Sequence, residues 1–139
     1  MPQIITTGIR ALIEDAEKKI RTLSAEEAIG LYGRADVVFV DIRDIRELQR
    51  EGRMPGAFHC PRGMLEFWID PQSPYHKEVF AQDKSFVFFC AAGLRAVLAT
   101  EAAQRMGLKP VAHIGGGFGA WKKAGGPVEH SVPASAPKT

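Results

Sequence analysis

Apolar residues recur at helical spacing in the first part of the chain. From residue 9 onward they return every three to four positions, with charged residues between them: Ile9, Leu12, Ile13, Ala16 and Ile20. This period places all of them on one face of an amphipathic helix. We therefore predict a helix over residues 8–21, and we assign residues 1–21 to an N-terminal helical extension that precedes the main domain.

From residue 22 onward, short apolar runs alternate with stretches of helical character. The apolar runs predict strands over residues 37–40, 57–60, 85–89 and 110–114. Capping residues predict helices between and after them, over residues 24–33, 44–51 and 95–106, with a last short helix around Trp121. Residues 61–83 contain three prolines and are expected to be irregular. This alternation is typical of a three-layer α/β domain with a mostly parallel sheet, which we place over residues 22–128.

Composition supports one ordinary globular domain. The 139 residues are 45% hydrophobic and 24% charged, and 18 basic against 16 acidic residues leave a net charge of +2. A charge this small gives no reason to expect nucleic acid or an anionic membrane as a partner. No apolar stretch approaches the ~20 residues that cross a bilayer. The final stretch, residues 129–139, is rich in proline, serine and alanine and is expected to be a disordered tail.

The two cysteines are too few to form a disulfide framework, so we expect a cytoplasmic protein with reduced thiols. Cys60 closes a predicted strand and is expected to be a core residue, with a resolving thiol as the alternative. His59 precedes it, but no second pair of metal-binding residues stands at ligand spacing. We therefore expect no metal and no cofactor.

Cys90 stands in the setting that a reactive cysteine needs. It directly follows the most apolar predicted strand, and a short loop leads from it to the start of the next helix. Ligands of open parallel sheets gather at the carboxyl ends of the strands. Loop N–H groups and a helix start can both stabilise an anion there, and the thiolate is the nucleophilic form of cysteine. We therefore predict that Cys90 is the catalytic nucleophile and that the backbone N–H groups of the loop after it form a nest for an anion. The loop residues are Ala91, Ala92, Gly93, Leu94 and Arg95, and they are the candidate substrate-binding residues.

Four motifs resemble those of the rhodanese-like domain family, and in particular its single-domain sulfurtransferases. The likeness runs from about Arg21 to Val128. In chain order the motifs are Asp41-Ile42-Arg43 with Glu47, then Gly52-Arg53-Met54-Pro55-Gly56-Ala57, then the loop Cys90-Ala91-Ala92-Gly93-Leu94-Arg95, and finally Gly116-Gly117-Phe118-Gly119-Ala120-Trp121. The resemblance implies a rhodanese-like α/β fold, with a central sheet of about five strands flanked by helices.

The resemblance also implies a two-step sulfur transfer that needs no cofactor. Cys90 would take the outer sulfur of a donor such as thiosulfate and become a persulfide, and a thiol or cyanide acceptor would then remove that sulfur. The loop amides would hold the charged sulfur, while Arg95 would place a positive charge beside an anionic donor. Ala91, Ala92 and Leu94 carry no charge, unlike the loops of some thiosulfate-specific relatives, so the physiological donor stays open.

Residues around the loop are expected to support it. We predict that Arg43 pairs with acids and braces the turn beside the loop, with Asp41 and Glu47 as the acids. An acid–base cluster is the alternative interpretation of these three residues. In the irregular segment 61–75, three further side chains are expected either to wall the pocket or to belong to the core: Arg62, Phe67 and Trp68.

Other functions stay open at this point. A cysteine phosphatase or an arsenate reductase also surrounds an anion with a loop between a cysteine and an arginine, but those loops are one residue longer than this one. A sulfur carrier that loads and unloads on protein partners, and an interaction module without catalysis, are two further alternatives. The apolar stripe of residues 8–21 is expected to serve a partner or a second copy of the chain in a homodimer, or simply to cover the domain.

Overall fold

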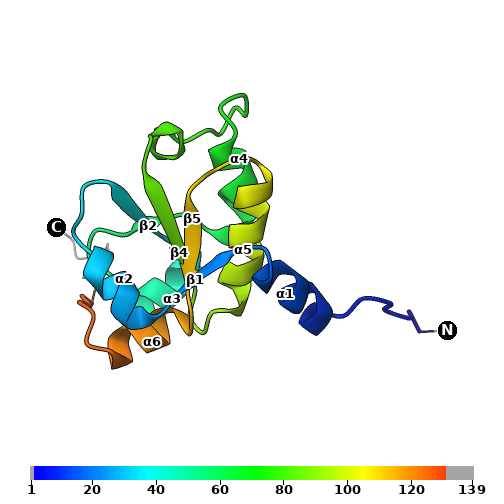
Figure 1. Ribbon diagram of the computed structural model, residues 1–139, viewed down its shortest axis with the longest axis horizontal. Helices are drawn as coiled ribbons and strands as arrows, with labels where there is room; N and C mark the ends of the chain where they lie inside the picture. The colour runs from blue at the N-terminus through cyan, green and yellow to red at the C-terminus, as the bar shows by residue number, and fades with distance from the viewer. Residues whose placement is uncertain (1, 131–139) are drawn as a thin grey trace.

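Five parallel strands form the central sheet of the protein, in the order β1-β5-β4-β2-β3 (Figure 1). The structure is a computed structural model and describes residues 2–130. The strands are β1 (Arg21–Leu23), β2 (Val37–Asp41), β3 (Phe58–His59), β4 (Ser85–Phe89) and β5 (Val111–Ile114). The predicted α/β fold, with a parallel sheet of about five strands, is therefore confirmed.

Helices cover both faces of this sheet (Figure 1). Phe86 and Phe88 of β4 pack with α4 and α5 on one face, whereas Val87 and Phe89 pack with α2 and α6 on the other. Alternate residues of β4 thus enter opposite cores, as expected for a strand that is buried on both sides. The helices are α1 (Ile9–Glu17), α2 (Ala25–Leu31), α3 (Ile45–Glu51), α4 (Leu65–Ile69), α5 (Leu94–Arg105) and α6 (Gly117–Lys123).

The N-terminal helix is shorter than its periodicity predicts, and a strand follows it. Helix α1 ends at Glu17, and β1 begins at Arg21 and pairs with β5 so that Leu23 lies opposite Ile114. The predicted helix through residue 21 is therefore wrong at its end, and the boundary between residues 21 and 22 divides a strand. With one buried side chain in three residues, β1 is too short to produce an alternating pattern.

Two other segments differ from expectation. Residues 61–83 are not wholly irregular, since they contain α4 and two short 3-10 helices, η1 (Arg62–Met64) and η2 (Glu78–Ala81). In the predicted tail, Glu129 is held to the domain because its backbone pairs with that of Arg53 and the two side chains form an ion pair. Residues 131–139 lie outside the described part of the chain.

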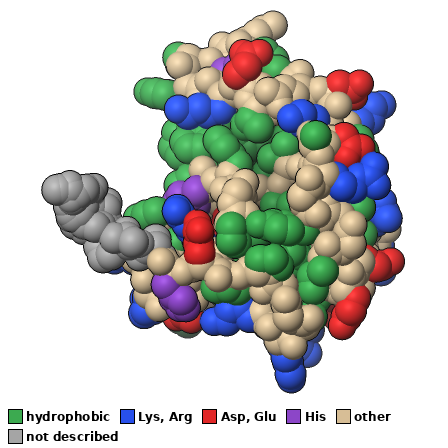
Figure 2. Space-filling model, turned by 90° about the vertical axis from the view of Figure 1, so that its left-hand side faces the viewer, with side chains coloured by type: hydrophobic (Ala, Val, Ile, Leu, Met, Phe, Trp, Pro, Cys, Tyr) green, Lys and Arg blue, Asp and Glu red, His purple; other side chains and the backbone are tan. Residues whose placement is uncertain are grey.

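Apolar side chains reach the surface on more than one side of the molecule. They gather within a frame of charged groups on the side opposite the N-terminal end (Figure 2). A groove of about 510 Å³ follows the edge strand β3 and is lined in part by Pro55, Phe58 and Val79. Near the other end of the chain, Ile4 and Ile5 are exposed. Within residues 2–130, no helix combines the length and the apolar character that crossing a membrane requires.

Candidate active site

Cys90 lies at the carboxyl edge of the sheet, directly after β4. The neighbouring strand β2 ends beside it, because the Ile42 N–H donates to the carbonyl of Phe89 at 3.1 Å. The six-residue loop from Cys90 to Arg95 then turns into α5, which begins at Leu94. The sulfur therefore occupies the edge at which parallel α/β sheets bind their ligands.

Two backbone N–H groups point at the Cys90 sulfur. The Gly93 N–H lies 3.2 Å from Sγ and the Ala96 N–H lies 3.4 Å from it. Ala96 is the third residue of α5, so its N–H is one of those that have no partner within a helix. These donors and the positive end of the helix favour a negative charge on the sulfur. Ala96 was not among the residues predicted from the sequence, although an N–H without a helical partner in the first turn of the predicted helix was the signal for it.

Helix α6 fixes the backbone of the loop from behind. The Phe118 N–H donates to the carbonyl of Cys90 at 2.7 Å, and the Gly119 N–H donates to the carbonyl of Ala91 at 3.0 Å. Gly117 lies against the same backbone with φ of +63°, and a Cβ built on it would come within 2.5 Å of the Cys90 carbonyl oxygen. The first turn of α6 thus draws the loop carbonyls away from the sulfur and sets the shape of the loop.

This contact predicts a large effect of Gly117→Ala. The left-handed backbone costs a side chain about 1–2 kcal/mol, and the overlap with the loop adds about 1–3 kcal/mol, so we expect lower stability and slower turnover. Gly56→Ala is the matched control, because Gly56 has φ of +81° but nothing lies within 4 Å of the position that a Cβ would take there. Urea unfolding and sulfur-transfer assays on both variants measure the difference. Equal losses in the two variants would contradict a contact specific to the loop.

Arg43 and Asp41 form a buried ion pair behind the loop. Both side chains are 1% exposed, and Nη2 of Arg43 lies 2.7 Å from Oδ2 of Asp41 and donates to the carbonyl of Gly52 at 3.0 Å. The guanidinium carbon of Arg43 lies 4.3 Å from the ring centroid of Phe118, whose N–H holds the Cys90 carbonyl. The pair therefore connects the end of β2, the turn before β3 and the first turn of α6.

Glu47 pairs with Arg95 and not with Arg43. The two carboxylate oxygens of Glu47 each lie 2.9 Å from a terminal nitrogen of Arg95, in a bidentate arrangement. The Arg95 hydrogen bonds lower the pKa of the Glu47 carboxyl, and the same bonds raise the pKa of Arg95. The positive charge of Arg95 beside the loop is therefore compensated by the carboxylate of Glu47.

The three side chains expected near the pocket lie in different surroundings. Arg62 forms an ion pair with Glu66 beside α5, and Phe67 is exposed with its ring edge-to-face against Tyr75. Trp68 is partly buried and packs on the core cluster to which Cys90 also belongs. The pocket-wall role of these residues stays a prediction.

The second cysteine lies in a different environment. Cys60 is fully buried, and burial raises the pKa of its thiol to about 12, so it stays protonated at neutral pH. Both cysteines are free in the structure. Among the described residues, no group of three or more His, Cys, Asp and Glu side chains could hold a metal ion.

The Cys90 sulfur lies beneath the loop. Cys90 is 1% exposed, whereas Ala92, Leu94 and Arg95 of the same loop are exposed. The loop therefore covers the sulfur and itself forms the protein surface above it.

Two known proteins resemble this chain in sequence. The Mus musculus "thiosulfate sulfurtransferase/rhodanese-like domain-containing protein 3" is 27% identical over 100 residues, which are 68% of this chain and 64% of that protein. This chain thus spans less than two thirds of the mouse protein. The Homo sapiens thiosulfate:glutathione sulfurtransferase is 26% identical over 106 residues, which are 72% of this chain and 91% of that protein.

A solved structure and a family model complete the comparison. A Rhodopseudomonas palustris protein of unknown function, named as a possible tyrosine phosphatase, is 62% identical, with a TM-score of 0.90 over 93% of this chain and 99% of that one. The model of the Rhodanese-like domain family matches residues 24–124. This range includes the whole Cys90 loop and the strands β2, β3, β4 and β5. The chain therefore belongs to the rhodanese-like domain family.

Proposed function

We propose that this protein is a sulfurtransferase that carries sulfur as a persulfide on Cys90. The observation that carries the proposal is the pair of N–H groups, from Gly93 and Ala96, that point at Sγ. They match a negative charge on Sγ, which is the charge that the thiolate carries. Family membership and the names of the relatives support the same chemistry.

The proposed reaction has two displacement steps. With thiosulfate as donor, the Cys90 thiolate attacks the outer sulfur, a new S–S bond forms at Cys90, and sulfite leaves with the electrons of the broken S–S bond. The acceptor then attacks the outer sulfur of the persulfide and restores the thiolate. Cyanide becomes thiocyanate in this step, and a thiolate becomes a persulfide. In the second step the negative charge returns to Sγ of Cys90, and the N–H groups of Gly93 and Ala96 that point at this atom stabilise it.

We propose a low-molecular-weight thiol or a protein thiol as the physiological acceptor, in the reducing environment of the cytoplasm. The human relative is named for thiosulfate and glutathione, which supports a thiol in this role. A reducing compartment also keeps Cys90 available as a thiol between cycles. Unloading onto a protein thiol would make the same domain a sulfur relay, and the chemistry at Cys90 would be unchanged.

The Glu47–Arg95 pair is proposed to tune the choice of donor. Glu47→Gln should raise kcat/KM for thiosulfate about two- to five-fold, because Arg95 then offers an uncompensated charge to an anionic donor and an exposed ion pair is worth up to about 1 kcal/mol. Glutamine can still cap α3 as Glu47 does. Glu51→Gln removes the same charge from the same helix and is the control. An unchanged or lower value for Glu47→Gln would contradict this role.

The direct test of the proposed function is the intact mass of the protein after exposure to thiosulfate and, separately, to 3-mercaptopyruvate. We expect a gain of one sulfur atom, located at Cys90 by peptide mapping and removed by cyanide or by dithiothreitol. The donor that loads the protein faster identifies the better substrate class. If neither donor adds sulfur and cyanide yields no thiocyanate, the proposal is wrong.

A cysteine phosphatase is the second candidate, because the 62% identical structure is named as a possible tyrosine phosphatase. The loop geometry supports sulfur transfer instead. Four residues separate Cys90 from Arg95, one fewer than in phosphatase loops, and the shorter loop suits one sulfur atom better than a tetrahedral oxyanion. Hydrolysis of p-nitrophenyl phosphate above the level of a Cys90→Ser variant would establish the phosphatase reaction.

A further inference from the structure

An exposed, uncharged arm, residues 2–8, precedes α1 and carries two adjacent isoleucines. Ile4 is 84% exposed and Ile5 is 75% exposed, and the arm runs away from the rest of the molecule (Figure 1). None of the side chains between Pro2 and Gly8 is charged. Exposure of two adjacent isoleucine side chains to water is unfavourable in free energy, so burial of the arm against another protein surface would be favourable.

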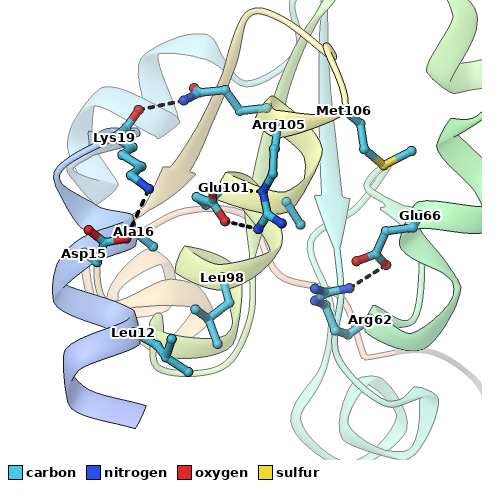
Figure 3. Close-up of a pocket in the computed structure, with 12 residues that line it drawn as sticks. Leu12, Asp15, Ala16, Lys19, Arg62, Glu66, Leu98, Glu101, Arg105 and Met106 are labelled. Carbon is cyan, nitrogen blue, oxygen red and sulfur yellow. Dashed lines mark hydrogen bonds and ion pairs between the residues drawn. The ribbon is translucent and has the colours of Figure 1, made fainter. Parts of the chain in front are cut away.

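A cleft of suitable chemistry lies between α1 and α5 (Figure 3). Its volume is about 910 Å³, and its apolar lining comes from both helices and from the residue that directly follows α5: Leu12, Ala16, Leu98, Ala102 and Met106. The charged side chains around it neutralise one another in three ion pairs, namely Lys19 with Asp15, Arg62 with Glu66, and Arg105 with Glu101 (Figure 3). A cleft with an apolar lining and balanced charges fits a neutral, apolar peptide segment.

We propose that two copies of this chain form a homodimer in which the arm of each copy occupies the α1–α5 cleft of the other. The uncharged arm and the charge-balanced cleft match each other, and one two-fold axis satisfies both contacts at once. An extended segment of this length reaches roughly 20–25 Å, enough to pass from one copy to the next. The arm of the same copy leaves the opposite end of α1 from Ala16 and Lys19, so it would have to reverse at Gly8 to enter its own cleft.

The first test is the mass of the full chain in solution by sedimentation or light scattering. We expect twice the 15.2 kDa of one chain for the unmodified protein. The double variant Ile4→Asp/Ile5→Asp should return to the mass of one chain. Thr6→Asp/Thr7→Asp is the control, because it places the same charges on the same exposed arm and leaves both isoleucines in place.

The second test alters the cleft. Ala102→Glu places a larger, charged side chain in the cleft and should also give the mass of one chain, whereas Ala11→Glu, on the exposed side of α1, should leave the dimer intact. A mixture of the arm variant and the Ala102→Glu variant should regain dimers. Each mixed pair then holds one intact arm in one intact cleft.

The outcomes separate the possible occupants of the cleft. An unmodified protein with the mass of one chain overturns the proposal, whether the arm then binds its own cleft or a different protein fills it. A dimer that survives both Ile4→Asp/Ile5→Asp and Ala102→Glu also overturns it, because the copies then meet elsewhere. Recovery of dimers in the mixture confirms exchange of arms between copies. Sulfur loading of Cys90 is a separate measurement and does not depend on these results.

Discussion

Cys90→Ser should reduce sulfur transfer by about a thousandfold or more while the domain stays folded. A serine hydroxyl is a far weaker nucleophile toward sulfur, and it cannot form the persulfide. The substitution is nearly isosteric, so Gly93 and Ala96 keep an acceptor opposite their N–H groups. Thiosulfate:cyanide turnover and the intact mass after loading measure the loss, and circular dichroism with urea unfolding reports the fold.

Cys60→Ser is the matched control for this variant. Cys60 is as deeply buried as Cys90, but its raised pKa, near 12, keeps it protonated and unreactive. We expect its substitution to leave turnover within about twofold of the unmodified protein. If Cys60→Ser also abolished turnover in a folded protein, Cys60 would take part in the reaction as a second thiol. Activity of Cys90→Ser close to that of the unmodified protein would refute the nucleophile assignment.

Arg43→Ala should cause the largest loss of stability among the variants considered, about 3–5 kcal/mol. The substitution leaves the carboxylate of Asp41 buried at 1% exposure without its partner, and it removes the hydrogen bond to the carbonyl of Gly52. It also removes the contact beneath Phe118, so the loop above should lose its fixed shape. Urea unfolding measures the stability, and turnover well below the unfolding midpoint measures the effect on the site.

The double variant Asp41→Leu/Arg43→Met tests the cause of that loss. When both charges are replaced by apolar groups of similar size, no buried charge is left unpaired, and stability is commonly recovered. We therefore expect the double variant to be more stable than Arg43→Ala. Its turnover should nevertheless stay low, since the hydrogen bond to Gly52 and the cation over Phe118 are both missing. Equal stability of the two variants would show that the unpaired carboxylate is not the cause.

The sequence predicted those parts of the fold that leave a local pattern. The run from Ser85 to Phe89 indicated a central strand, and its end placed Cys90 at the edge of the sheet. Strand β1 left no such pattern, because three residues with one buried side chain gain their structure from pairing with β5. The apolar periodicity of α1 also continued past the end of the helix at Glu17. Ile20 fits the helical spacing, but it packs against the core from the segment that follows the helix.

The sequence indicated which residues form the candidate site, but not the ion pairs and hydrogen bonds that join them. Cys90 and its loop follow from the strand, the glycine and the helix start. The sequence could not show which arginine pairs with which acid. Asp41 and Glu47 both lie near Arg43 along the chain, so Glu47 looked like a partner of Arg43. It pairs with Arg95 because of how α3 lies against α5, which no local pattern reveals. The contribution of α6 was also hidden, since hydrogen bonds from its first turn to Cys90 and Ala91 join segments that are distant in sequence.

The covered position of Cys90 has a consequence for the lifetime of the proposed persulfide. Cys90 is 1% exposed, so bulk solvent has little direct access to the sulfur atom that would carry the load in the proposed reaction. In the proposed two-step reaction sulfite leaves before the acceptor attacks, so donor and acceptor need not be present together. We therefore expect that a protein loaded with thiosulfate and then separated from the donor keeps the added sulfur until an acceptor is supplied.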